Sequence, residues 1–125
     1  MMFGRMRAGA ARPVRVLGLP GNPASSIVCA LVFLTPLIDA LLGRPRRDRT
    51  EPAVIGAALA ANDQRQDYLR ATLAQRPDAL PAATPLPAQD SGMLSALASA
   101  DCLLIRPPNA PAAKTGDPCR VLRLP

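Results

Sequence analysis

The stretch Gly-Leu-Pro-Gly-Asn-Pro-Ala-Ser-Ser at residues 18–26 joins a short apolar run to a long apolar segment. Its two prolines and central glycine favour a rigid, tight turn. Asn22 is a good N-cap residue, and Pro23 suits the first helical position, where its missing N–H costs nothing. We expect the backbone amides of residues 24–26 to point out of the helix start, which favours an anion. The stretch therefore predicts a phosphate or oxyanion platform.

The residues on either side of this turn predict the end of an α/β domain. A short apolar run at 14–17 is typical of a strand, and apolar residues recur at helical spacing across 23–42. Gly43 suits the position just after the helix, and Pro36 should kink the helix or begin a second helical segment. One strand and one helix do not make a parallel sheet by themselves. We therefore expect residues 1–43 to close a larger α/β domain.

The predicted helix is apolar on nearly all of its faces, so we expect it to be covered on more than one side. Its most apolar part, 27–34, continues to Leu42 only through Thr35, Pro36 and Asp39. We interpret this segment as too short and too interrupted to span a bilayer. The prediction is a buried core helix and no membrane partner.

The composition excludes several mechanisms and favours anionic partners. The chain has no histidine, which removes a histidine base, a histidine-ligated metal and a Ser-His-Asp triad within these residues. The net charge is +6, with fourteen arginines and one lysine, and a basic balance favours phosphate esters, oxyanions or nucleic acid. The three cysteines form no Cys-x-x-Cys pair, which predicts free thiols in a cytoplasmic protein.

A change in the sequence pattern predicts a second, β-rich domain over residues 51–125, which is joined to the first by a basic linker at 44–50. We interpret the linker as solvated, and the alternative is a nucleic-acid-binding patch. Short strand-like runs separated by Pro, Gly and Asn predict a small, half-open β-barrel. The expected strands are Ala53–Ala60, Tyr68–Leu73, Leu103–Ile105 and Arg120–Leu124, with a weak fifth at Thr84–Leu86, a loop at Pro77–Pro87 and a short helix at Ser91–Ala98.

Arg70 and Ser91 are the candidate ligand-binding side chains of this second domain. In an alternating strand, Arg70 projects away from the core, and a planar guanidinium held there suits bidentate binding of an oxyanion. The alternative is a surface arginine paired with Asp67 or Glu51. Ser91 opens the expected short helix and either holds an anion or caps the helix. The sequence shows no metal-ligand cluster, so we predict no metal site.

These residues resemble a known family. The run from Phe3-Gly4-Arg5 through the 18–26 stretch to Cys29 and Pro36 resembles the C-terminal part of molybdopterin molybdenumtransferase, the bacterial counterpart of the gephyrin E domain. The similarity continues through Asp67-Tyr68-Leu69-Arg70, Gln89-Asp90-Ser91, the strand from Ala100 to Leu104, and Gly116-Asp117. It covers essentially the whole chain. The Leu-Pro-Gly-Asn-Pro-x-Ser block is its most specific part.

The resemblance implies a function and a set of roles. The family inserts molybdenum, delivered as molybdate, into adenylated molybdopterin with release of AMP, using Mg²⁺, and its members are homodimers. On this resemblance, residues 1–43 end the molybdopterin-binding α/β domain and residues 51–125 are the fourth, barrel domain. The implied catalytic residues are Pro20 and Pro23, and the implied cofactor- or substrate-binding residues are Gly21, Asn22, Ser25, Arg70 and Ser91.

The sequence also departs from the family pattern. The glycine-rich loop with its catalytic aspartate and the acidic magnesium ligands have no counterpart in these residues, so we expect no complete transfer by this chain alone. One alternative is a non-catalytic relic that binds molybdopterin or a partner. Another is nucleic-acid binding by the 44–49 arginines, which should weaken steeply with salt.

Overall fold

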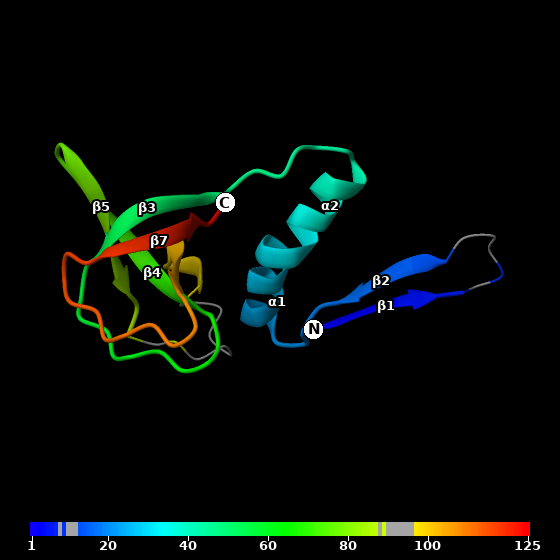
Figure 1. Cartoon of the computed structure of the whole chain (residues 1–125), viewed down its shortest axis with the longest axis horizontal. Helices are drawn as coiled ribbons and strands as arrows, with labels where there is room; N and C mark the ends of the chain where they lie inside the picture. Colours follow the sequence, from blue (N-terminus) through cyan, green and yellow to red (C-terminus); the bar gives the residue numbers. More distant parts are fainter. Residues whose placement is uncertain (8, 10–12, 88, 90–96) are drawn as a thin grey trace. The chain divides into compact units, whose positions relative to one another are not determined.

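The computed structural model describes residues 1–7, 9, 13–87, 89 and 97–125. The chain divides into two compact units, Met1–Arg47 and Asp48–Pro125. In Figure 1 the first unit carries the blue and cyan elements and the second carries the green to red strands.

The first unit begins with a two-stranded antiparallel ribbon. β1 (Met2–Met6) pairs with β2 (Val14–Gly18), and Gly4 lies opposite Val16 at the centre of the register. The expected strand at 14–17 is thus present. β1 is an addition to the sequence-based expectation, because its central Gly-Arg interrupts the apolar run that would have indicated a strand.

A long helix follows the turn and ends as predicted. It runs as α1 (Pro23–Cys29), a π-helical stretch η1 (Ala30–Leu34) and α2 (Thr35–Leu41). Gly43 lies just beyond with a φ of 68°. Its N–H donates to Ala40 O at 3.2 Å, and the next N–H, of Arg44, donates to Asp39 O at 2.9 Å. These two hydrogen bonds satisfy carbonyls of the last helical turn and terminate the helix.

The π-helical stretch is the structural consequence of Pro36. Proline has no N–H to donate into the preceding turn, and its ring crowds the carbonyl four residues earlier. The helix responds by widening: the N–H of Thr35 bonds to Ala30 O, and Thr35 Oγ1 donates to the same oxygen at 3.1 Å. The predicted effect of Pro36 therefore takes the form of a wider turn followed by α2, with proline in its first turn.

The helix is less covered within its unit than the sequence indicated. Pro23–Leu41 is continuous, and by length and composition alone it would be able to cross a membrane. The expectation that the segment is too short and interrupted is therefore wrong, because Thr35, Pro36 and Asp39 all lie inside the helix. A single such helix is weak evidence for a span, since core helices of soluble proteins meet the same criteria. Only Ala24 is buried along it within this structure.

The second unit is a closed five-stranded barrel. Its strand order is β3-β5-β4-β6-β7, and β3 also pairs with β7, which closes the ring. The expected half-open barrel is therefore corrected: two parallel pairs between β3 and β5 and five antiparallel pairs between β3 and β7 complete it. The strands are β3 (Thr50–Ile55), β4 (Asp67–Arg76), β5 (Ala79–Pro85), β6 (Cys102–Arg106) and β7 (Pro118–Arg123).

Two boundary predictions in the barrel were wrong. The segment Pro77–Pro87 was expected to be a loop, but β5 occupies most of it. Pro85 is compatible with a strand because that end of β5 pairs only with β4. The first strand ends at Ile55 and does not reach Ala60. Most of the expected helix Ser91–Ala98 lies outside the described residues. Its last two residues, Leu97 and Ala98, are described and are helical.

The barrel interior is small and aliphatic. Alternate residues of each strand point inward, so Cys102 and Leu104 of β6 and Val121 of β7 meet at the centre. Small residues allow the five strands to approach closely, and three of them, Ala53, Ala71 and Ala83, are fully buried. The alanine-rich sequence is therefore suited to a narrow barrel.

Burial of Cys102 predicts a loss of barrel stability at alkaline pH. Burial raises the pKa of this thiol from 9.0 to about 11, with a smaller contribution from Asp101. The unfolded chain releases the proton at lower pH than the folded chain. The stability contribution is therefore complete below pH 9 and is lost as the pH rises through 11, by at most about 2–3 kcal/mol. Urea unfolding at several pH values measures this.

The control for that experiment is Cys102→Ala, which should flatten the alkaline decline while lowering stability at neutral pH. In the native protein at pH 8, iodoacetamide should leave Cys102 unmodified. An alkaline slope identical in the variant, or rapid native alkylation of Cys102, would show that the thiol is not buried as described.

Candidate functional site

The Pro-Gly-Asn-Pro turn is built as a self-capped helix start. Asn22 is the N-cap: its Oδ1 accepts the N–H of Ser25 at 3.1 Å, and its carbonyl accepts the N–H of Ser26 at 2.8 Å. Pro23 occupies the first turn, as predicted. The cap thus uses two of the three amides that were expected to face an anion. The anion platform is narrower than predicted, and of those three amides only that of Ala24 is left outside the cap.

The turn holds five of the candidate residues within one short stretch of the first unit. Gly21 and Pro23 are exposed, whereas Pro20, Asn22 and Ser25 are half-buried. Two prolines fix the backbone dihedrals on both sides of Gly21. The side chains and carbonyls of this turn are therefore presented on a rigid support, which suits a binding loop.

Arg70 lies in the middle of β4 and is buried. Its neighbours Leu69 and Ala71 belong to the barrel interior, so Arg70 lies on the outer face of the strand, as predicted. Exposure is where the prediction fails, because only 6% of the residue is accessible. Leu103, its register partner on β6, and Leu97 are buried as well, although neither belongs to the interior cluster. The outer face of the barrel is therefore covered at Arg70.

Gln89 holds the backbone of Arg70 as a neighbouring strand would. Its Oε1 accepts the N–H of Arg70 at 3.0 Å, and its Nε2 donates to Arg70 O at 2.9 Å and to Leu86 O at 2.8 Å. The N–H of Leu86 also donates to Arg70 O at 2.8 Å. A primary amide carries the same donor and acceptor as a peptide group. Gln89 therefore extends the sheet beyond the end of β5 and fixes the position of Arg70.

The guanidinium of Arg70 is incompletely satisfied. Its Nε is buried and has no hydrogen-bond partner among the described residues. The alternative of a surface ion pair is wrong, since Arg70 is buried, Glu51 instead pairs with Arg123 at 2.7 Å, and no ion pair joins Arg70 to Asp67. A buried cationic donor without a partner is costly and unusual. An oxyanion is the chemical group that a guanidinium binds through two parallel N–H bonds.

The remaining candidates are not all placed. Ser91 lies outside the described residues. The turn at Pro20–Ser25 and Arg70 belong to different units, so each half of the candidate site stands by itself. Within the described ranges, no group of three or more His, Cys, Asp or Glu side chains is arranged to hold a metal ion. The Mg²⁺ implied by the resemblance therefore finds no fit among these side chains, and we derive no chemical step through it.

Gln89 was missed as a positioning residue because its role depends on the pairing of Arg70 with residues beyond the end of β5, and a side chain that replaces a strand leaves no sequence pattern. We expect Gln89→Ala to lower the free energy of unfolding by about 1–3 kcal/mol, because the N–H of Arg70 loses its partner and Arg70 O keeps only the N–H of Leu86. The matched control is Gln75→Ala, which replaces an exposed glutamine of β4, the strand of Arg70. It should change the free energy of unfolding by less than about 0.5 kcal/mol. Urea unfolding of both variants checks this. Equal stability losses in the two variants would contradict this role of Gln89.

The fold and this site define a class: a small closed barrel that carries a buried arginine and follows a two-stranded ribbon and a long helix. The family model for the MoeA C-terminal region (domain IV) matches residues 52–124. Two curated relatives from Mycobacterium tuberculosis, both called molybdopterin molybdenumtransferase 1, are 33% identical over 105 residues, covering 79% of this chain. The chain belongs to the MoeA C-terminal region (domain IV) family.

Solved structures show the same fold. The molybdopterin biosynthesis MoeA protein from Pyrococcus horikoshii superposes with a TM-score of 0.67 at 15% identity, over 83% of this chain and 26% of that one. A molybdenum cofactor biosynthesis protein from Pyrococcus furiosus gives 0.66 at 17% identity, over 83% of this chain and 36% of that one. This chain spans about a quarter (24%) of the curated relatives it matches.

Proposed function

We propose that this chain is the C-terminal part of a molybdopterin molybdenumtransferase, an enzyme of molybdenum cofactor biosynthesis. The reaction joins molybdenum from molybdate to the dithiolene of adenylated molybdopterin and releases AMP. Family membership supports this proposal, as does the name of the relatives at 33% identity. The working enzyme is proposed to be a cytoplasmic homodimer.

The observation that carries the proposal is the buried, incompletely paired guanidinium of Arg70. Molybdate is a tetrahedral oxyanion, and two parallel N–H bonds from arginine match two of its oxygens. A cation already withdrawn from water binds an anion more strongly than an exposed one would. Arg70, positioned by Gln89, is therefore proposed to bind and orient molybdate, together with Ser91.

The turn is proposed to be a second substrate-binding element of the enzyme. Pro20 and Pro23 hold its backbone rigid, and Gly21 leaves room for close approach of the substrate. Asn22 and Ser25 are assigned to substrate binding, with Ser25 contributing its hydroxyl because its N–H is used by the cap. The magnesium and the acid–base groups are proposed to come from parts of the enzyme outside these residues.

A chimera tests this function. The Mycobacterium tuberculosis relative, with its matched quarter replaced by this chain, should convert adenylated molybdopterin, molybdate and Mg²⁺ into molybdenum cofactor with release of AMP. This chain alone should show no turnover. A folded chimera that binds molybdopterin without turnover would favour the non-catalytic relic. Turnover by this chain alone would contradict the assignment of the catalytic groups to other parts of the enzyme.

A further inference from the structure

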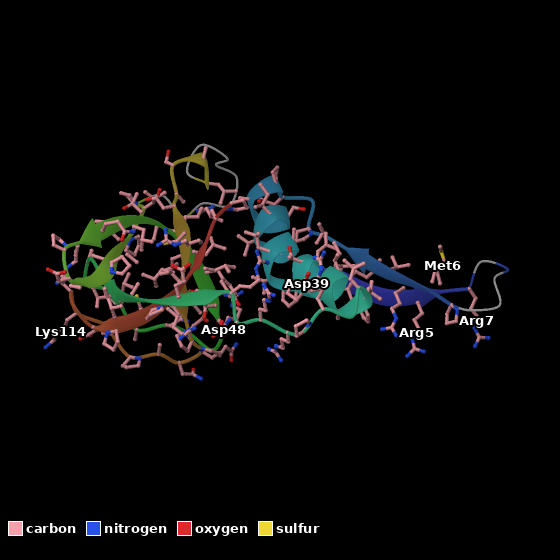
Figure 2. The ribbon with its side chains drawn as sticks, turned by 90° about the horizontal axis from the view of Figure 1, so that it is seen from above. Arg5, Met6, Arg7, Asp39, Asp48 and Lys114 are labelled. Carbon is pink, nitrogen blue, oxygen red and sulfur yellow. The ribbon has the colours of Figure 1, made fainter. Side chains whose placement is uncertain are left out.

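Arg70 differs from the exposed cations of this chain in what surrounds it. Arg5, Arg7 and Lys114 are exposed, and Figure 2 shows their side chains projecting from the backbone into solvent. An anion beside such a side chain keeps most of its own hydration shell. Arg70 is buried. An anion that reaches its guanidinium therefore has to give up water.

Leu103 lies beside Arg70 on the neighbouring strand β6, with both side chains on the outer face. The N–H and the carbonyl of Arg70 bond to Gln89 and Leu86, so both point away from β6. Arg70 and Leu103 are register partners, and they therefore form a non-hydrogen-bonded pair, the kind in which side chains approach most closely. Leu103 is fully buried. The side chain of Arg70 thus has an aliphatic neighbour that is withdrawn from water.

The side chains that flank Arg70 along β4 offer few hydrogen-bond donors to an anion. Residues two apart on a strand share a face, so these neighbours are Tyr68 and Thr72. Thr72 Oγ1 donates its one proton to Thr84 O at 3.4 Å. The Tyr68 hydroxyl accepts from Gln66 and keeps one proton to donate. Besides the guanidinium, these two neighbours therefore replace at most one of the hydrogen bonds that water made to the anion.

The unpartnered Nε shows which edge of the guanidinium is available. Nε is the donor nearest the aliphatic stem, and together with one Nη it can offer two parallel N–H bonds to an oxyanion. It is buried and has no hydrogen-bond partner among the described residues. No ion pair joins Arg70 to a carboxylate in the same part of the chain. An oxyanion bound at this edge therefore lies beside the stem, in the desolvated part of the site.

We propose that this site selects its oxyanion by the cost of dehydration, with Leu103 as the specificity-determining residue. The cost of moving an ion out of water falls as the ion becomes larger. Molybdate has the charge of sulfate but longer bonds from its central atom to oxygen, so it loses its water at a lower cost. The inference rests on the proposed function, which names molybdate as the ligand of Arg70.

The same reasoning orders the other tetrahedral oxyanions. Hydrogen phosphate carries an O–H that needs an acceptor, and neither a guanidinium nor a leucine supplies one. Tungstate matches molybdate in charge and nearly in size. The site therefore favours molybdate and tungstate alike, and it discriminates against sulfate and hydrogen phosphate.

Competition on the full chain tests this order. The chain is dialysed to equilibrium with molybdate and each competing anion, and bound molybdenum is measured by mass spectrometry. We expect tungstate to compete within about twofold of molybdate, whereas sulfate and phosphate should need at least about 30-fold higher concentrations. Arg70→Met should lose the retained molybdenum, which separates this site from general attraction to a net charge of +6. Sulfate as effective as tungstate, no retention by the wild type, or full retention by Arg70→Met would overturn the proposal.

A matched pair of variants tests the role of Leu103. Leu103→Thr keeps a residue suited to a strand and places a hydroxyl and room for water beside the guanidinium. The preference for molybdate over sulfate should fall at least about fivefold, whereas loss of a purely structural contact would weaken both anions equally. Ile105→Thr, on the same strand and face, should leave the preference unchanged. Equal changes in the two variants would overturn the role of Leu103, and the wild-type competition stands whether or not Leu103→Thr folds.

Turnover of the chimera is scored separately from selectivity. Sulfate should inhibit molybdenum insertion only at concentrations at least about 30-fold above those at which tungstate inhibits it. An active chimera that sulfate and tungstate inhibit equally would overturn the selectivity and leave the proposed function in place. An inactive chimera together with selective binding by the chain would support the selectivity and count against the proposed function.

Discussion

Replacement of Arg70 by methionine should reduce molybdenum insertion by the chimera at least about 100-fold while leaving the barrel as stable as before or more stable. The activity loss has the size expected when a donor to a transition-state oxyanion is removed. The stability result has a separate cause. Arg70 is 6% exposed and its Nε has no partner among the described residues, so its burial is a cost to folding. An apolar side chain of similar length removes that cost.

The two readouts distinguish a ligand-binding arginine from a structural one. A structural arginine would lower both activity and stability when it is replaced. Arg70→Lys should recover little activity, because an ammonium keeps the charge but not the planar fork that binds two oxygens. Arg76→Met, an exposed arginine at the end of the same strand, is the matched control and should leave both properties unchanged. A folded Arg70→Met chimera with full turnover would contradict the role.

Gly56→Ala should lower the free energy of unfolding of the barrel by about 3 kcal/mol. Gly56 follows β3 where the parallel β3–β5 contact closes the ring, and its N–H donates to Ala83 O at 2.8 Å. A Cβ at Gly56 would lie 2.1 Å from Thr84 Oγ1, 3.1 Å from Ala83 O and 3.2 Å from Ala83 C. The hydroxyl can rotate away, but the Ala83 backbone moves only with β5.

A double-mutant cycle with Thr84→Ala measures this contact. Removal of the hydroxyl should recover at least about 1 kcal/mol of the Gly56→Ala loss, and the rest should remain because Ala83 is still close. Urea unfolding of the four proteins gives the coupling free energy. A Gly56→Ala barrel within about 0.5 kcal/mol of the wild type would show that the parallel contact is loose and the barrel open there.

Local features of this fold were predictable from sequence, whereas closure of the barrel was not. Asn22, Pro23 and Gly43 act through neighbouring backbone groups, and all three were placed correctly as the start and end of the helix. Only the end of β5 was predicted, as a weak strand at Thr84–Leu86, because the Pro and Ala content of the rest resembles a loop. Its strand character comes from pairing with β4 and β3, which are distant in sequence. The closed barrel depends on that pairing.

In the candidate site, too, only the locally determined features were predictable from sequence. Alternation along β4 placed Arg70 on the outer face, since side-chain direction is a local property of a strand. The burial of Arg70 was not predictable, because it depends on residues distant in sequence, such as Gln89, which lies nineteen residues away. The anion platform failed in part for a local reason: a good N-cap residue consumes the amides that were assigned to the ligand.

The location of bound molybdate tests the central claim most directly. Crystals of the chimera grown with molybdate, and measured on both sides of the molybdenum absorption edge, locate the metal by anomalous scattering. The proposed role of Arg70 predicts one peak within hydrogen-bond reach of its guanidinium, which is lost in Arg70→Met. A peak elsewhere, with the Arg70 guanidinium fully bonded to protein groups, would contradict it.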